Sequence, residues 1–249
     1  MLTGFWKLTW VEIKVFVREP MGVIGSLLIP VVLFVVFSRT LGGAKSAPTP
    51  TLPVNSPFNP AIFAALFLAI SAALSLIAII SIYREGGILK RLRATPLSPV
   101  TILGSHVFVK LVFTVIGMAL LVLAGRRMFP GLMQVNVIGF IAAVLLSTVS
   151  ILSAGFVVAS IVPTARFAQP IGAAVFYPMI TISGLFFPVD RLPIALRVLA
   201  NILPTTHAVA LMQGVWTGSG WTAQLGSAAA LIAISAVCIA LTTRVFRWE

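Results

Sequence analysis

The stretch PAIFAALFLAISAALSLIAIISI, residues 60–82, decides the fold class of this chain. It contains no charged residue, and it is long enough to cross a hydrocarbon core of about 30 Å, which takes about 20 helical residues. The whole chain resembles this stretch in composition, since 59% of its 249 residues are hydrophobic and only 9% are charged. A soluble domain carries about 25% charged residues. We therefore expect lipid to be the main solvent of this protein.

Five further apolar runs accompany residues 60–82. The predicted spans are about 21–39, 60–82, 106–124, 135–162, 170–187 and 225–243. Lys110 lies near the start of the third span, where a lysine costs about 2.5–3.5 kcal/mol if it is central and much less if it snorkels to the surface. The predicted fold is an all-α polytopic membrane protein with six transmembrane helices in a single domain, residues 1–249.

The flanking basic residues indicate the orientation of the spans. With a cytoplasmic N-terminus, the inner flanks hold Lys7, Lys14, Arg18, Arg84, Lys90, Arg91, Arg93, Arg166, Arg244 and Arg247. The outer flanks then hold Arg39, Lys45, Arg126, Arg127, Arg191 and Arg197. Basic residues concentrate on the cytoplasmic side, so we expect both termini inside, although the pair at 126–127 argues the other way. The same placement attributes the net charge of +12 to anchoring and anionic lipid, and no nucleic-acid partner is expected.

Residues 1–19 have the pattern of an amphipathic helix. Lys7, Lys14 and Arg18 share one helical face, while apolar residues that include Trp6 and Trp10 cover most of the rest. A basic helix with tryptophans is typical of the membrane interface, and its charges argue against a cleavable signal peptide. The alternative is a cytoplasmic extension of the first span. Pro20 favours a bend between the two.

The loop after residues 60–82 carries a second amphipathic segment, within EGGILKRLRATPLSP at 85–99. Residues 88–93 form a short predicted helix, with apolar side chains on one side and basic side chains on the other. The prolines at 96 and 99 prevent this helix from continuing. Such a helix suits docking into a groove of a cytoplasmic partner. It is equally compatible with a positive-inside anchor.

The stretch GLFFPVDRLPIALRVLANILPTTHAVALMQGVWT, residues 184–217, is cut by Pro188, Pro193 and Pro204. Pieces of about ten residues are roughly 15 Å long as helix, too short to cross and yet too apolar for an open loop. We therefore expect re-entrant or interfacial helices on the outer side over about 188–217. They serve either as a plug or gate, or as a stabilising cap.

Small and hydroxyl-bearing residues recur within the spans. Ala61, Ala65, Ala69 and Ala73 share one face of the second predicted span, which lets helices approach closely. Hydroxyls stand among the apolar residues at Ser71, Ser75, Ser147, Ser150 and Ser153. They suit an amphiphilic cargo, and helix packing explains them equally well.

Residues that could act in catalysis, ion coupling or metal binding are sparse in this sequence. The acidic residues are Glu12, Glu19, Glu85, Asp190 and Glu249, all outside the middle of a predicted span. A carrier driven by protons or sodium usually holds a carboxylate inside the membrane, so that class is disfavoured. His106 and His207 lack metal-ligand spacing, and the sequence has no G-x-x-x-x-G-K-[ST] phosphate loop. We predict no catalytic residues, no metal site and no ATPase site in this chain.

Two motifs resemble those of a known family. The loop EGGILKRLRATPLSP at 85–99 and the stretch SGLFFPVDRLP…LPTTH at 183–207 resemble the ABC type-2 exporter permeases. The six-span subunits of daunorubicin-type drug exporters are similar in size. The resemblance covers nearly the whole chain and implies a type V ABC exporter-like fold.

The resemblance also implies roles for three groups of residues. A coupling helix, about 85–93, that sits in a cleft of an ATP-binding subunit would comprise Glu85, Gly86, Gly87, Ile88, Leu89, Lys90, Arg91 and Leu92. An outer gate of re-entrant helices would comprise Ser183, Gly184, Phe186, Phe187, Pro188, Pro193, Pro204, Thr206 and His207. An interfacial connecting helix over 1–19 would comprise Trp6, Lys7, Trp10, Lys14 and Arg18.

The function that the resemblance implies is export from a bacterial or archaeal cell across the plasma membrane. The substrate would be hydrophobic or amphiphilic, such as a drug, a polyketide, a lipid or a glycan-linked molecule. Two separate ATP-binding subunits would bind ATP and Mg²⁺. The permease would pair with a second permease subunit, either as a homodimer or with a related permease. The alternatives are a secondary carrier or channel, and a membrane scaffold or sensor that transports nothing.

Overall fold

The computed structural model describes residues 2–18, 20–41, 59–87, 99–128, 136–162 and 164–245. Within these ranges the regular elements are all helical. In chain order they are α1 (Leu2–Arg18), α2 (Pro20–Val23), the π-helical η1 (Ile24–Leu28), α3 (Ile29–Leu41), α4 (Pro60–Glu85), α6 (Pro99–Met128), α7 (Val137–Ile161), α8 (Ala165–Thr181), the 3-10 turn η2 (Val189–Arg191), α9 (Ile194–Ile202), α10 (Pro204–Trp216), α11 (Gly220–Ala223) and α12 (Leu225–Val245). The protein is an all-α polytopic membrane protein, as predicted.

Among the described residues, four helical segments are long and apolar enough to cross a bilayer. They are Pro60–Glu85, Gly104–Arg127, Val137–Ile161 and Leu225–Arg244, and they coincide with the second, third, fourth and sixth predicted spans. The pair α9 and α10 is bent by 79° and adds a fifth crossing if it counts as one broken span.

The first and fifth predicted spans differ in detail from the structure. The first is a continuous run of α2, η1 and α3, and its apolar part, Ile24–Thr40, is shorter than the four long helices. The fifth is α8, which has Pro170 and Pro178 inside it and ends at Thr181 rather than at residue 187. Residues 182–187 form turns and bends, and Gly184 adopts a φ of +90° that favours glycine.

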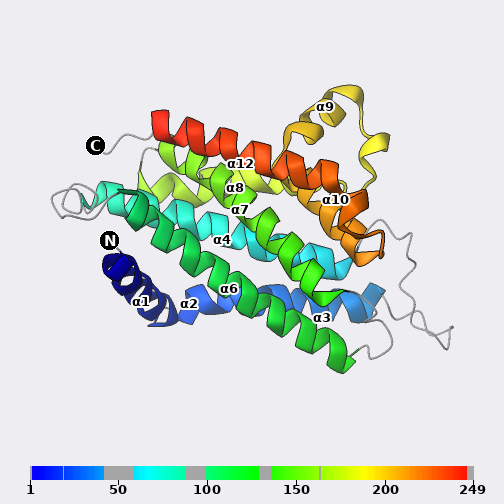
Figure 1. Ribbon diagram of the computed structural model, residues 1–249, viewed down its shortest axis with the longest axis horizontal. Coiled ribbons are helices and arrows are strands. Elements are labelled where there is room, and N and C mark those ends of the chain that lie inside the picture. Colours follow the sequence, from blue (N-terminus) through cyan, green and yellow to red (C-terminus); the bar gives the residue numbers. More distant parts are fainter. Residues whose placement is uncertain are drawn as a thin grey trace.

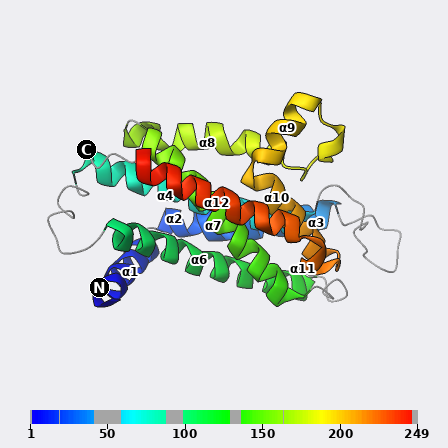
Figure 2. The same ribbon diagram turned by 45° about the horizontal axis from the view of Figure 1, so that its top comes forward.

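The long helices lie side by side along one axis (Figure 1). The oblique helix α1 lies at one end of this bundle, together with the last turns of α4 and α12 (Figures 1 and 2). Helix α9 lies at the opposite end. We call these two ends the α1 end and the α9 end. Both described termini of the chain are thus at the α1 end.

Close packing between α4 and α7 forms the centre of the bundle. The alanine face of α4 that the sequence indicated is buried along its whole length. A Cβ atom at Gly155 of α7 would lie only 3.4 Å from the Cβ of Ala73. On its other side α7 meets α12, where the hydroxyl of Ser150 donates to the carbonyl oxygen of Leu231 at 3.1 Å. The alanine face therefore serves packing within the chain.

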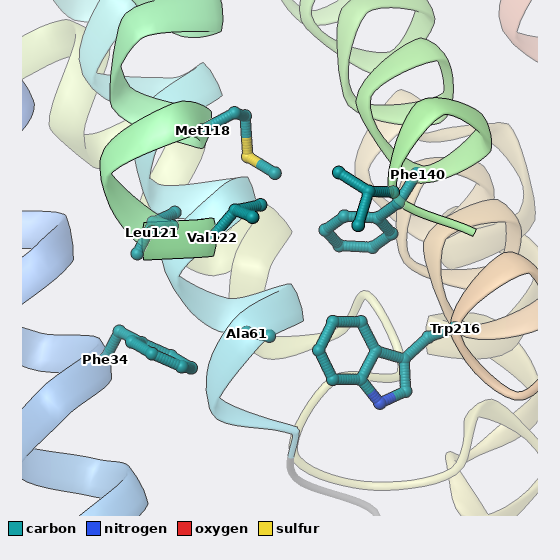
Figure 3. Close-up of a pocket in the computed structure, with 8 residues that line it drawn as sticks. Phe34, Ala61, Met118, Leu121, Val122, Phe140 and Trp216 are labelled. Carbon is teal, nitrogen blue, oxygen red and sulfur yellow. The ribbon is translucent and has the colours of Figure 1, made fainter. Parts of the chain in front are cut away.

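Toward the α9 end the helices close on apolar side chains (Figure 3). Phe34, Ala61, Phe140 and Trp216 are among the residues around a space of about 20 Å³. The rings of Phe140 and Trp216 meet edge to face, with centroids 5.2 Å apart. A space of this size has room for about one water, but its apolar walls offer that water no hydrogen bonds. We expect this end of the bundle to be dry.

Candidate functional site

A cavity of about 480 Å³ lies between α1, the α2–η1 segment, α4, α6 and α8. The α4 residues along its wall run from Phe67 to Tyr83, which places it in the part of the bundle nearer the α1 end. Ligand pockets typically have volumes of about 300–1,000 Å³. The cavity is therefore large enough for a small molecule.

Three polar side chains from three helices meet on the cavity wall at the α1 end. The hydroxyl of Tyr83 on α4 donates to Oε1 of Glu12 on α1 at 2.8 Å. Nδ1 of His106 on α6 lies 3.4 Å from Oε2 of the same carboxylate. The rings of Tyr83 and His106 are in edge contact, with centroids 5.3 Å apart. Glu12 thus ties α1 to α4 and α6.

Lys110 lies one helical turn beyond His106 on α6, and it too lines the cavity. Its side chain is only 4% exposed. Nζ donates to the hydroxyl of Ser75 at 2.6 Å and lies 4.8 Å from the centroid of the Phe16 ring, a cation–π contact. Of the two placements considered for Lys110, the structure has the buried one and not the one that snorkels to the surface. Its ammonium group turns inward because a hydroxyl and an aromatic face stabilise it there.

The π-helical segment η1 forms another part of the wall. Gly25 and Ser26 lie in it and line the cavity, and a Cβ atom at Gly25 would meet no atom within 4 Å. The hydroxyl of Ser26 donates to the carbonyl oxygen of Gly22 at 2.6 Å. Single π turns inside longer helices occur frequently at functional sites. The sequence analysis missed this segment, although small residues within a run of bulky ones are a signal of it.

Aromatic rings stand at the other end of the cavity. Phe63 lies one turn beyond Phe67 on α4, and their ring centroids are 6.2 Å apart. The ring of Phe63 also meets Phe37 of α3 at 5.4 Å and Phe186 at 6.1 Å. We call these four residues the aromatic cap. It lies between the cavity and the α9 end, and it includes one residue, Phe186, of the predicted outer gate.

The other residues of the predicted outer gate lie around α9 and α10. Prolines precede or begin each short helix as predicted, because Pro188 precedes η2, Pro193 precedes α9 and Pro204 is the first residue of α10. Ser183 is buried, and its hydroxyl donates to the carbonyl oxygen of Ile180. Phe187 is exposed, whereas Thr206 is buried. Nε2 of His207 lies 2.9 Å from the carbonyl oxygen of Asn201. Among all the residues of the predicted outer gate, only Phe186 contributes to the aromatic cap.

The predicted coupling helix is described only at its start. Glu85 is the last residue of α4, and its Oε2 accepts a hydrogen bond from the backbone N–H of Ala165 at 2.7 Å. Ala165 begins α8, where a negative charge is favourable for the helix dipole. Gly86 and Gly87 form a turn, with Gly87 at a φ of +64°. Residues 88–93, including Ile88, Leu89, Lys90, Arg91 and Leu92, lie outside the described residues.

The predicted interfacial segment is a single helix, α1. Trp6 is 57% exposed and Trp10 is 66% exposed, and Lys7, Lys14 and Arg18 are exposed as well. On its buried side the ring of Phe16 packs on that of Phe113 of α6, with centroids 4.1 Å apart. The helix is confirmed. Its position in a membrane interface stays a prediction.

A single family model covers the helices that form the cavity, the aromatic cap and the bent pair α9–α10. The model of the family described as ABC-2 type transporter matches residues 3–216, from α1 through α10. A search among curated proteins found no match to the chain. The family match spans the cavity wall, the aromatic cap and the bent pair α9–α10. The chain belongs to the ABC-2 type transporter family, and it is the membrane component of such a transporter.

Proposed function

We propose that this chain is the permease subunit of an ATP-driven exporter that moves a hydrophobic or amphiphilic substrate out of the cytoplasm. It lies in the plasma membrane of a bacterium or an archaeon, with both termini in the cytoplasm, and it pairs with a second copy of itself. Two separate ATP-binding subunits, which hold ATP and Mg²⁺, dock on the loop after α4. The substrates of this class include drugs, polyketides, lipids and glycan-linked molecules.

The observation that carries this proposal is the hydrogen bond between Glu85 and Ala165. Glu85 ends α4 and begins the predicted coupling helix, while Ala165 begins α8. Both α4 and α8 line the cavity. A displacement of the loop after α4 therefore reaches two walls of the cavity at once.

A second contact extends this link to α7. Nη1 of Arg84 lies 3.4 Å from the carbonyl oxygens of Ala159 and Ser160, in the last turn of α7. Three helix ends are thus joined next to the loop that would receive the ATP-binding subunit. This joint supports the transmission of a cytoplasmic movement into the membrane-spanning part.

The placement of polar and aromatic groups supports export as the direction. The cavity lies toward the α1 end, which also holds Glu85 and both described termini (Figure 1). The aromatic cap lies between the cavity and the α9 end, and its Phe67 lines the cavity. A substrate that enters from the α1 end would meet this cap on its way outward, and its release would require the rings to part.

The test uses the permease reconstituted with its ATP-binding subunit in inside-out vesicles. We expect ATP-dependent uptake of at least one compound from a panel of fluorescent amphiphiles with anionic, neutral and cationic head groups. We expect Glu85→Ala to lower this uptake several-fold while membrane insertion and copurification with the ATP-binding subunit persist. Glu85→Gln retains a hydrogen-bond acceptor and should lie between the two. Asp190→Ala removes an exposed acidic residue near the α9 end, and it serves as the matched control with unchanged uptake.

Two outcomes would favour other functions. Uptake at the same rate without ATP, or without the ATP-binding subunit, would indicate a secondary carrier or a channel. The absence of nucleotide-dependent movement with every ATP-binding partner would indicate a scaffold or sensor. Normal uptake by the Glu85→Ala variant would contradict the coupling role of this residue.

A further inference from the structure

We propose that the cavity selects amphiphiles that carry an anionic oxygen head group, a carboxylate or a phosphate, and that Lys110 holds this head. The inference rests on the proposed function, and it names the substrate class of the same site. The apolar body of the ligand lies against side chains of α4 such as Phe67, Ile70 and Leu74, which line the cavity.

The negative charge that we infer for the head group follows from the positions of the two charged side chains on the wall, Lys110 and Glu12. Lys110 contacts Ser75, and Glu12 contacts Tyr83. Ser75 and Tyr83 are eight positions apart on α4, a distance of about 12 Å along the helix. Ser75 is farther from the α1 end, so Lys110 marks the deeper part of the cavity. Glu12 lies at the α1 end, where the hydroxyl of Tyr83 and the ring of His106 engage its carboxylate.

The burial of Lys110 strengthens its attraction for an anion. A charge interacts several-fold more strongly with an opposite charge in a low-dielectric site than in water, and Lys110 is almost wholly removed from solvent. A cationic head group at the same place would meet a like charge, which discriminates against cationic amphiphiles. The hydroxyls of Ser71 and Ser75 stand one turn apart on α4 and also line the cavity. They add polar groups next to Lys110 without adding charge.

The apolar part of the ligand is tested separately through Gly25. This glycine lines the cavity, and a side chain added there would enter open space rather than the core. Gly25→Leu therefore removes cavity volume without a clash at its Cβ. Lys110→Met removes the charge and keeps a side chain of similar length. The two variants change the two halves of the proposed site independently.

The experiment measures binding of dansyl-labelled undecanoic acid and of its uncharged methyl ester by fluorescence titration. The permease is used alone in phosphatidylcholine nanodiscs, without ATP. We expect the acid to bind about tenfold more tightly than the ester, because a charge-assisted hydrogen bond contributes about that factor. Lys110→Met should abolish this preference, Lys110→Arg should retain it, and Gly25→Leu should weaken both ligands. Arg126→Met removes an exposed charge from the far end of α6 and should change neither affinity.

Several results would overturn the proposal. One is equal affinity for the acid and the ester, and another is equally tight binding of a dansyl-labelled alkyl trimethylammonium of the same chain length. Displacement of the acid by inorganic phosphate as readily as by dodecyl phosphate would refute the need for an apolar body. If Lys110→Met does not fold, Gly25→Leu still tests the location of the site. Unchanged affinity for the acid in the Gly25→Leu variant would show that the acid does not bind in this cavity.

The failure of this inference is distinguishable from a failure of the proposed function. A permease that binds the acid in this way but is not driven by ATP would contradict only the proposed function. ATP-driven transport confined to neutral or cationic compounds would contradict only the anionic selectivity.

Discussion

The hydroxyl of Tyr83, near the end of α4, donates a hydrogen bond to Oε1 of Glu12 on α1, although 71 positions separate them in the chain. This contact joins the oblique helix α1 to the bundle. The ring contacts of Phe16 and Phe5 with α6 hold the same helix by apolar surface alone. The position of α1 therefore depends on the polar contacts that Glu12 makes with Tyr83 and His106, and it should respond when the contact with Tyr83 is removed.

Tyr83→Phe should lower the free energy of unfolding by about 1 kcal/mol, because the hydrogen bond is lost while the ring stays. Glu12→Ala should also be destabilising, and the two changes together should cost less than their sum, since both remove the same interaction. The measurement is thermal unfolding of the four forms of this double-mutant cycle in nanodiscs. Tyr177→Phe, which alters the other tyrosine on the cavity wall, should instead be additive with Glu12→Ala. Additive effects for Tyr83 would show that the bond contributes nothing to stability.

Gly155→Leu should destabilise the bundle by about 1–3 kcal/mol, the usual range for overpacking. Its side chain would point at Ala73, which lies in ordinary contact distance of a Cβ atom at Gly155. Gly226 lies in the helix α12, where a Cβ atom meets nothing within 4 Å, so Gly226→Leu is the matched control. Thermal unfolding of both variants checks this expectation. Equal stability of the two would contradict the close approach of α4 and α7.

Gly184→Ala should destabilise more than Gly218→Ala does. Both glycines have positive φ angles, of 90° and 84°, where an alanine costs about 1–2 kcal/mol. Only at Gly184 would the new Cβ also come within 3.0 Å of Cγ2 of Val189. The second change Val189→Ala removes that contact, and it should abolish the difference in stability between the two glycine variants. A failure of this rescue would leave backbone strain as the whole effect.

The orientation of the chain is open to cysteine labelling. Cys238 is the one cysteine in the sequence, so Cys238→Ser provides a cysteine-free background. In intact cells we expect a membrane-impermeant maleimide to label Lys45→Cys but to label Arg91→Cys only after permeabilisation, because basic residues concentrate on the cytoplasmic side. The reverse pattern would invert the topology and would place the loop after α4 outside the cell.

Much of the fold follows from local patterns that a sequence displays directly. Long apolar runs predicted α4, α7 and α12 within a few residues of their observed ends, because a helix in lipid must satisfy its own backbone. The breaks at Pro188, Pro193 and Pro204 were equally local. The early end of α8 and the π turn in η1 depend on packing and on turn geometry, and apolar periodicity carries no information about either.

The site was harder to predict, because its residues meet only in three dimensions. The apolar run that begins near residue 106 places Lys110 near the start of a predicted span. The helix α6 in fact begins at Pro99 and carries the lysine into the bundle. The contact of Glu12 with Tyr83 and His106 joins three separate helices, so no sequence spacing indicates it. One local signal was present. His106 and Lys110, like Ser71 and Ser75, stand four residues apart, which places each pair on one helical face.

The two sides of α4 have different consequences for the evolution of this protein. On the alanine face, packed against α7, selection for stability removes almost any larger residue. On the face that lines the cavity, positions such as Ser71 and Ala78 border open space, where a new side chain changes what is accommodated and leaves the core intact. Related proteins can thus differ in the substrates that they accept while they keep the same fold, because the residues that determine packing and the residues that line the cavity lie on opposite faces of α4.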